Sequence, residues 1–247
     1  MYKGKKIAVV IPSKNEENNL PIVVQQIPTF VDEIIISVTS LIDTSWKVFE
    51  ELNNSYPVKF VVQDKPGKGA AQKKAINSTG CEIIVLLDAD GSTDPSEITD
   101  VLDMLIVSNA DLVKGSRYLT LGGSDDLTAF RSFGNLILTK IGNLMYRQIY
   151  TDLAYGFVAY NRSSLIKLSA TKTDNKFEIL NYGNGFEFET LVLSRMARSK
   201  MKIKEFPSYE LKRIDGFSNL RAIRDGFRLL FTLLFERFKI VYKNHKT

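Results

Sequence analysis

The chain has 247 residues, of which 44% are apolar and 25% are charged, and its formal net charge is +5. This length supports one domain with a sizeable hydrophobic core. Cys81 and His245 are the only cysteine and the only histidine, which excludes a disulfide framework, a zinc site and a histidine-based triad. Any acid, base or metal ligand is therefore expected to be a carboxylate.

The distribution of charge and of apolar residues predicts a cytoplasmic protein with no nucleic-acid partner. Positive charge is spread along the chain, without a zinc-finger or arginine-rich pattern. The N-terminus runs straight into a strand-like segment without an apolar leader. The longest clean apolar run, 229–235, is far shorter than the roughly 20 residues that a spanning helix needs. Anionic small substrates or lipid headgroups are the expected partners.

The first half of the chain alternates strand-like and helix-like segments. Short β-rich runs occur at Ile7–Ile11, Ile34–Val38, Val58–Val62 and Ile83–Leu87, and helical spacing follows each of them. This alternation predicts parallel strands with right-handed crossovers, an α/β fold with helices on both sides of the sheet. In such folds ligands bind outside the carboxyl ends of the strands.

Two carboxylates follow the fourth run, in the segment Asp88-Ala89-Asp90-Gly91. In extended chain, residues i and i+2 point the same way, so both can face one site. Mg²⁺ or Mn²⁺ on a diphosphate is usually held by one or two carboxylates plus water and phosphate. An ordinary turn is the alternative interpretation. Asp94 and Pro95 then predict the start of a helix.

The second half has a different order of predicted elements and is interpreted as the acceptor side of the same domain. A glycine-containing stretch at 115–126 precedes an apolar helix near 135–146 and another helix from Phe186. Glu187 and Glu189 on that helix are interpreted as solvated or structural. From about Leu220 a basic, aromatic-rich amphipathic helix is expected, which either lies in a membrane interface or packs on its own domain.

Several motifs occur in a fixed order along the chain: Ile11-Pro12-Ser13-Lys14-Asn15-Glu16, Gly67-Lys68-Gly69, Leu87-Asp88-Ala89-Asp90-Gly91, Lys114-Gly115-Ser116-Arg117, Arg131, Thr151-Asp152-Leu153, Gly156-Phe157, Gly185-Phe186-Glu187, Glu205-Phe206-Pro207, and Arg213 with Gly216 and Ser218. Together they resemble family 2 glycosyltransferases, especially the dolichyl-phosphate mannose and glucose synthase branch. The resemblance reaches to about residue 236. It implies a GT-A fold, Rossmann-like and mostly parallel, over 1–219, with a nucleotide half at 1–114, an acceptor half at 115–219 and a helix and tail at 220–247.

The resemblance also implies roles for individual residues. Asp90 would bind the metal, and Asp88 would lie near the ribose or the metal. Arg117 and Arg131 look like the arginines that hold phosphate groups. The remaining nucleotide-binding residues that it implies are Pro12, Asn15, Glu16, Thr39, Asp64, Lys68, Gly69, Ala89, Arg213 and Ser218.

Asp152 and the end of the second strand bear on the acceptor and on the nucleotide, respectively. Asp152 is either a general base, if the acceptor is a hydroxyl, or a residue that orients the acceptor loop, if the acceptor is an anionic phosphate. The chain departs from the family at the end of its second strand, where Val38 and Thr39 stand in place of two acidic residues. Recognition of the nucleotide base is the property that this departure affects.

The expected function is that of an inverting, metal-dependent glycosyltransferase, using Mg²⁺ or Mn²⁺. It would move a sugar from a UDP- or GDP-type donor to a polyprenyl phosphate or glycan acceptor, in cell envelope glycan biosynthesis on the inner face of the membrane. One alternative is a sugar-1-phosphate nucleotidyltransferase, although no Gly-Thr-Arg segment occurs near the N-terminus. The other is a non-catalytic module that binds nucleotide sugars, which the missing acid pair suggests.

Overall fold

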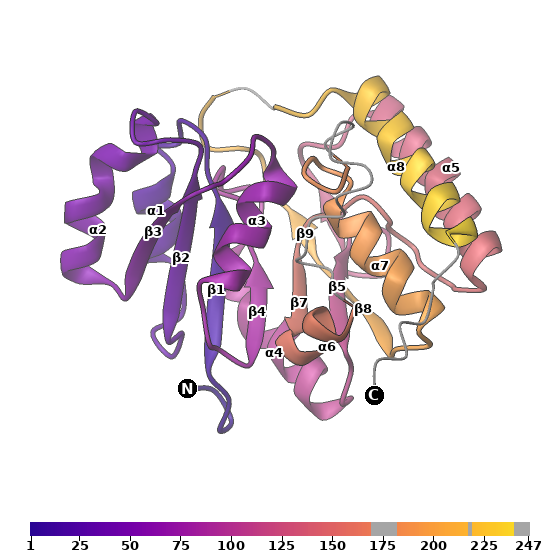
Figure 1. Ribbon diagram of the computed structural model, residues 1–247, viewed down its shortest axis with the longest axis horizontal. Coiled ribbons are helices and arrows are strands. Elements are labelled where there is room, and N and C mark those ends of the chain that lie inside the picture. Colours follow the sequence, from indigo (N-terminus) through magenta and orange to yellow (C-terminus); the bar gives the residue numbers. More distant parts are fainter. Residues whose placement is uncertain (169–181, 217–218, 240–247) are drawn as a thin grey trace.

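A seven-stranded sheet forms the centre of the protein, with strand order β3-β2-β1-β4-β7-β5-β8 (Figure 1). The computed structural model describes residues 1–168, 182–216 and 219–239, so Ser218 lies outside the described residues. The strands are β1 Ile7–Pro12, β2 Glu33–Val38, β3 Val58–Val62, β4 Ile83–Leu86, β5 Leu112–Ser116, β7 Val158–Asn161 and β8 Ile203–Pro207. Only the pairs that β7 makes, with β4 and β5, are antiparallel, which confirms the predicted mostly parallel sheet. Two short strands, β6 Gly123–Ser124 and β9 Tyr209–Glu210, form a separate ribbon.

Helices cover both faces of the sheet because alternate residues of the central strands are apolar on both sides. Ile7, Val9 and Ile11 of β1 pack with α1 and α4, whereas Ala8 and Val10 pack with α3 and α7. The helices are α1 Leu20–Gln25, α2 Phe49–Ser55, α3 Lys68–Asn77, α4 Ile98–Val107, α5 Ala129–Tyr146, α6 Arg162–Lys167, α7 Phe188–Arg198 and α8 Ala222–Phe238. Single 3-10 turns, Thr44–Val48 and Pro95–Glu97, precede α2 and α4.

The predicted elements are present, with small shifts at their ends. The helix predicted near 135–146 begins at Ala129, because the Thr128 side chain accepts a hydrogen bond from the amide of Arg131 and caps the helix there. Asp94 caps the 3-10 turn before α4 by accepting from the amide of Ser96.

The C-terminal helix α8 packs on α5 and α7 at one edge of the molecule (Figure 1). Leu229 and Leu233 are buried on its inner side, and the Tyr146 hydroxyl of α5 donates to the Leu233 carbonyl oxygen at 2.7 Å. The helix therefore packs on its own domain, while its other side stays exposed. Within the part of the chain that the structure describes, no helix is long and apolar enough to cross a membrane.

The strand order places the site. β1 lies between β2 and β4. From β1 the chain passes to β2 and β3 on one side and then crosses to β4 on the other side, and such a reversal opens a crevice at the carboxyl ends of the strands. Most residues from the end of β1 onward, Pro12, Ser13, Lys14 and Glu16, reach this crevice, as does the segment Asp88–Asp90 after β4.

Candidate active site

A cavity of about 1030 Å³ lies along the carboxyl ends of the strands. One end is lined by residues that follow β1, β2 and β3, and the other by the N-terminal halves of α5 and α8. The predicted site residues that line it are Pro12, Glu16, Thr39, Asp64, Lys68, Asp88, Ala89, Asp90, Arg117, Arg131 and Arg213. The fold thus brings together residues that are up to two hundred positions apart in the sequence.

Three predicted site residues do not line the cavity. Asn15 has a positive φ of 57°, and its backbone amide donates to Asp43 Oδ1 at 2.9 Å, so it shapes the turn after β1. Gly69 donates its amide to the Gly185 carbonyl oxygen and joins α3 to the loop before α7. Asp152 is completely buried. These residues lie behind the cavity wall.

Lys68 lies between two carboxylates in the middle of the cavity. Its Nζ is 2.7 Å from Asp88 Oδ1 and 3.3 Å from Glu189 Oε1, and Gln72 Nε2 donates to the same Glu189 oxygen at 2.7 Å. Burial alone would lower the pKa of Lys68, but Asp88 and Glu189 raise this pKa above its ordinary value. The ammonium group therefore stays charged, and it is placed to pair with an anionic ligand.

Asp90 is paired with a different cation. Arg213 Nη2 lies 2.5 Å from Asp90 Oδ2, and Arg213 Nη1 lies 3.6 Å from Glu16 Oε1. The loop that carries Arg213 rests on Gly91, where an added Cβ would lie 2.3 Å from the Ile214 side chain. Gly91 also has a positive φ of 75°, so both its conformation and its close contact require glycine. This glycine lets the loop cover the Asp90 side of the cavity.

The donor set fits a hard divalent cation held partly by its ligand. Asp88 and Asp90 supply two carboxylates, and no cluster of three or more potential metal ligands is found among the described residues. Mg²⁺ is commonly bound by one or two carboxylates together with water and substrate phosphates. Two carboxylates facing a cavity that is large enough for a nucleotide match that pattern.

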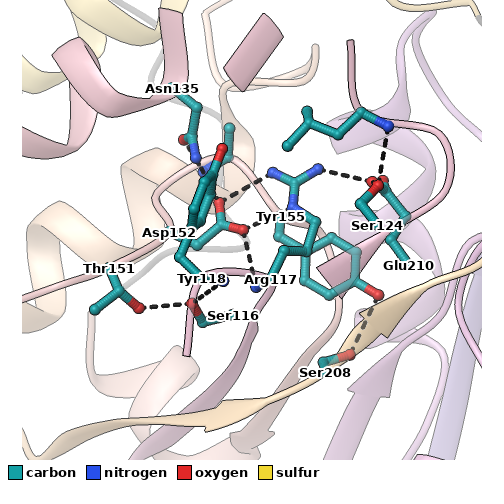
Figure 2. Close-up of polar contacts among 12 residues, drawn as sticks. Ser116, Arg117, Tyr118, Ser124, Asn135, Thr151, Asp152, Tyr155, Ser208 and Glu210 are labelled. Atoms are coloured by element: carbon teal, nitrogen blue, oxygen red, sulfur yellow. Dashed lines mark hydrogen bonds and ion pairs between the residues drawn. The ribbon is translucent and has the colours of Figure 1, made fainter. Parts of the chain in front are cut away.

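Arg117 lies in a buried charge network beside the cavity (Figure 2). Its Nε and Nη2 donate to the two oxygens of Asp152 at 2.7 and 3.0 Å, and its Nη1 donates to Glu210 Oε2 at 3.0 Å. The guanidinium also lies over the Tyr155 ring, 4.9 Å from its centroid. Most of the donors predicted to hold phosphate are thus engaged by protein carboxylates.

Both Asp152 oxygens are fully used. Besides Arg117, Asn135 Nδ2 donates to Oδ1 at 2.9 Å, and the Arg117 amide donates to Oδ2 at 3.3 Å (Figure 2). Lys114 donates to the Asp152 carbonyl oxygen. Burial would raise the pKa of Asp152, but Lys114 and Arg117 lower it below the ordinary carboxyl value. A buried carboxylate with four donors and a lowered pKa is a poor proton acceptor.

Arg131, on α5, is the other arginine predicted to bind phosphate, and it keeps more unpaired guanidinium donors than Arg117 within the part of the chain that the structure describes. Its Nη1 donates to the Asp126 side chain at 3.0 Å and to the Asp126 carbonyl oxygen at 3.3 Å. Nε and Nη2 have no partner among the residues that the structure describes. Arg131 itself lines the end of the cavity formed by α5 and α8.

Sequence reasoning missed several residues of the cavity. Glu189 lines it, although the sequence suggested a solvated or structural role, whereas Glu187 is buried and accepts from the amides of Gly183 and Gly185. Gln63 and Glu210 also line it. Gln63 follows β3 directly, so its position at a strand end was the available signal.

A mostly parallel sheet with an Asp-Ala-Asp loop beside a nucleotide-sized cavity at the carboxyl ends of its strands is the arrangement expected of the GT-A fold. Residues 8–169 match the model of glycosyl transferase family 2, and the chain belongs to that family. This result confirms the resemblance drawn from the motifs.

Individual relatives cover most of the chain. Polyprenol monophosphomannose synthase of Mycolicibacterium smegmatis is 28% identical over 87% of this chain and 81% of its own length. UDP-N-acetylglucosamine–dolichyl-phosphate N-acetylglucosaminyltransferase of Methanococcus voltae is 26% identical over 93% of this chain and 95% of its own. Glycosyltransferase AglJ of Haloferax volcanii is 26% identical, over 94% and 72% respectively.

Solved structures show the same fold at lower sequence identity. Glucosyl-3-phosphoglycerate synthase of Mycobacterium tuberculosis, in complex with Mn²⁺, UDP-glucose and phosphoglyceric acid, superposes with a TM-score of 0.70. It is 18% identical, and the match covers 95% of this chain and 80% of that one. At this identity the likeness establishes the fold.

Proposed function

We propose that this enzyme transfers a sugar, with inversion, from a UDP- or GDP-sugar to a polyprenyl phosphate at a membrane surface, and that it requires Mg²⁺ or Mn²⁺. The observation that carries the proposal is the pair Asp88 and Asp90, which lies in the cavity between the strand ends and the α5 and α8 end. This position matches the diphosphate of a donor whose nucleotide occupies the strand end.

The chain's own cations would hold the diphosphate. Lys68 and Arg213 are already aimed at the two carboxylates, and either can exchange a carboxylate for a phosphate oxygen. A divalent ion held by Asp90 and Asp88 would neutralise charge on the leaving nucleoside diphosphate. With the diphosphate fixed, the anomeric carbon would point toward the α5 and α8 end, open to direct displacement from the opposite side.

The acceptor is proposed from the absence of a suitable base at Asp152. A hydroxyl acceptor must lose a proton, whereas a polyprenyl phosphate oxygen is already anionic. Both carboxylate oxygens of Asp152 accept hydrogen bonds from Arg117 and Asn135, which suits a residue that orients the acceptor loop. The free donors of Arg131 would bind the acceptor phosphate. Two of the relatives are named for polyprenol or dolichyl-phosphate products, which supports this choice.

The outer faces of α5 and α8 support contact with a membrane. On α5, Phe130, Phe133, Ile137 and Leu144 are exposed at helical spacing. On α8, the exposed apolar side chains are Ile223, Phe227, Phe231, Leu234 and Phe238. The acidic residues of α8, Asp225 and Glu236, are buried, so the exposed charges on both helices are basic. An apolar surface with only positive charge fits an anionic lipid surface, such as the inner face of a membrane.

Donor turnover tests the proposal. The full chain would be incubated with UDP- and GDP-sugars, a polyprenyl phosphate and Mn²⁺, with EDTA in a parallel sample. We expect release of nucleoside diphosphate and formation of a glycosyl lipid, both lost with EDTA. A non-catalytic binding module would bind donor without releasing nucleoside diphosphate, and transfer that persists in EDTA would exclude the metal requirement.

A further inference from the structure

The end of β2 lies at the nucleotide end of the cavity, and only one of its two unusual residues faces that cavity. Val38 is completely buried and packs in the core with Leu52 and Phe60. Thr39 is half-buried and lines the cavity, with Gln63 and Asp64 beside it. Of these two positions, only Thr39 can therefore contact a nucleotide in the cavity.

The Thr39 hydroxyl has a fixed partner behind the cavity wall. Its Oγ1 lies 2.6 Å from Asp43 Oδ2, and the Thr39 amide donates to the same oxygen at 3.2 Å. The other Asp43 oxygen accepts from the amides of Asn15 at 2.9 Å and Ser45 at 3.0 Å. Asp43 is only 4% exposed and does not line the cavity.

The direction of the hydrogen bond between Thr39 and Asp43 follows from the charge of Asp43. Burial would raise the pKa of Asp43, but the hydrogen bonds from Thr39, Asn15 and Ser45 lower it below its ordinary value. The group is therefore an ionised carboxylate, which can accept hydrogen bonds but cannot donate them. The Thr39 hydroxyl must be the donor, so its only proton points to Asp43.

A hydroxyl whose proton is committed can offer only lone pairs to a ligand. Thr39 in isolation would donate or accept equally well and would select nothing. Held by Asp43, it can act only as an acceptor toward a ligand in the cavity, as a carboxylate at that position would, but without the negative charge.

We propose that Thr39, with its proton fixed by Asp43, selects nucleobases whose ring nitrogen on the pairing edge carries a hydrogen. Uracil and guanine have such a donor at the ring nitrogen of that edge, whereas cytosine and adenine have an acceptor there. This inference rests on the proposed binding of a nucleoside diphosphate and specifies which bases the site accepts. Asp43 is a positioning residue that acts through Thr39.

The preference should be moderate because the acceptor is neutral. One hydrogen bond between neutral groups changes an equilibrium by about tenfold. We expect UDP and GDP to bind about tenfold more tightly than CDP and ADP, well short of the 10⁴ or so that a dedicated polar site reaches.

Calorimetric titration of the full chain with UDP, GDP, CDP and ADP in the presence of Mn²⁺ tests the proposal. Thr39→Val removes the hydroxyl at nearly constant volume and should bring the ratio of UDP to CDP affinity close to one. Thr39→Ser should restore the parental ratio, and Thr39→Asp should widen it. Asp43→Asn frees the hydroxyl proton and should narrow the ratio. Thr44→Val, on the same loop but outside the cavity wall, is the matched control.

The outcomes separate the possible failures. An unchanged ratio in both Thr39→Val and Thr39→Asp would show that Thr39 does not face the base. If Thr39→Val instead weakens UDP and CDP equally, and 2′-deoxy-UDP shows no such loss, the hydroxyl contacts the ribose and the proposal is overturned. Failure of the parent protein to bind any of the four nucleotides would overturn the proposed function itself.

Discussion

The guanidinium of Arg213 lies 2.5 Å from the carboxylate of Asp90, at the place where the sequence predicts a metal ion. The loop carrying Arg213 is held there by the Ile214 amide, which donates to the Asp90 carbonyl oxygen at 3.0 Å, and by Asn18, which donates to Asp215 at 3.0 Å. A divalent cation on Asp90 must therefore displace a positive charge that belongs to the chain.

Arg213→Gln should consequently tighten Mn²⁺ binding in the absence of nucleotide, because the competing charge is removed. The same change should weaken UDP or GDP binding in the presence of Mn²⁺, because a diphosphate partner is lost. Calorimetry measures both affinities. Lys212→Gln, an exposed neighbour with the same change in charge, is the control. Equal tightening of Mn²⁺ binding in both variants would mean that net charge, not the contact with Asp90, is responsible.

Asp90→Asn should abolish metal-dependent transfer and leave the fold intact, because the amide keeps the volume of the side chain but loses its charge. We expect kcat/KM to fall on the order of 100-fold or more, about 3 kcal/mol of transition-state stabilisation. Circular dichroism checks the fold, and Asp100→Asn, exposed on α4, serves as the control. Turnover within about twofold of the parent would remove Asp90 from the metal site.

Asp152→Asn should act mainly on stability. It leaves Glu210 as the one carboxylate partner of the buried Arg117 among the described residues, and breaking a buried pair of this kind costs about 3 kcal/mol. Urea unfolding measures this loss. Transfer to a polyprenyl phosphate, normalised to folded protein, should persist with an unchanged pH profile. Loss of both the transfer and the acidic limb of that profile in a stably folded variant would instead identify Asp152 as the base.

Lys73 predicts a pH dependence of stability. It is 7% exposed, with Nζ 3.0 Å from Asn184 Oδ1, and burial, assisted by Arg195, lowers its pKa to about 8. Between this pKa and the ordinary value of 10.5 the unfolded chain binds more protons than the folded one, so this lysine makes stability rise with pH across that window.

Replacement of Lys73 by methionine should remove this rise of stability with pH and stabilise the protein at pH 7 by up to about 3 kcal/mol. Urea unfolding at pH 7 and at about pH 9.5 gives the comparison. Lys74→Met, beside it and only half-buried, should leave the pH dependence as it is in the parent. A variant at Lys73 with the parental dependence on pH would show that this lysine is not the group responsible.

The exposed aromatic residues of α5 and α8 predict lipid binding. Phe133→Ser combined with Phe227→Ser should reduce co-sedimentation with vesicles that contain anionic lipid, because both side chains are more than 60% exposed. Leu41→Ser combined with Ile42→Ser, on an exposed loop after β2, is the matched control. High salt should weaken the binding of the parent as well. Unchanged sedimentation of the aromatic variant would show that this surface does not contact the bilayer.

The sequence by itself determined the sheet and the position of the site within it. Strand boundaries such as Val58–Val62 follow from local runs of β-branched residues, and the Asp-Ala-Asp segment follows a buried strand. Strand ends carry the site in parallel α/β folds because the crossovers return the chain to the same edge of the sheet. Local pattern and general topology were therefore enough for this level of description.

Only the tertiary structure decided how the charges pair. Arg213 reaches Asp90 across more than a hundred residues, and Arg117 pairs with Asp152 from a separate element. Such pairs depend on side-chain directions and burial, which short-range periodicity does not encode. For the same reason the sequence alone does not decide whether the Thr39 hydroxyl donates or accepts, whereas the contact with the buried Asp43 fixes its proton. The chemistry of a hydroxyl or a carboxylate is set by its partner, and packing selects that partner.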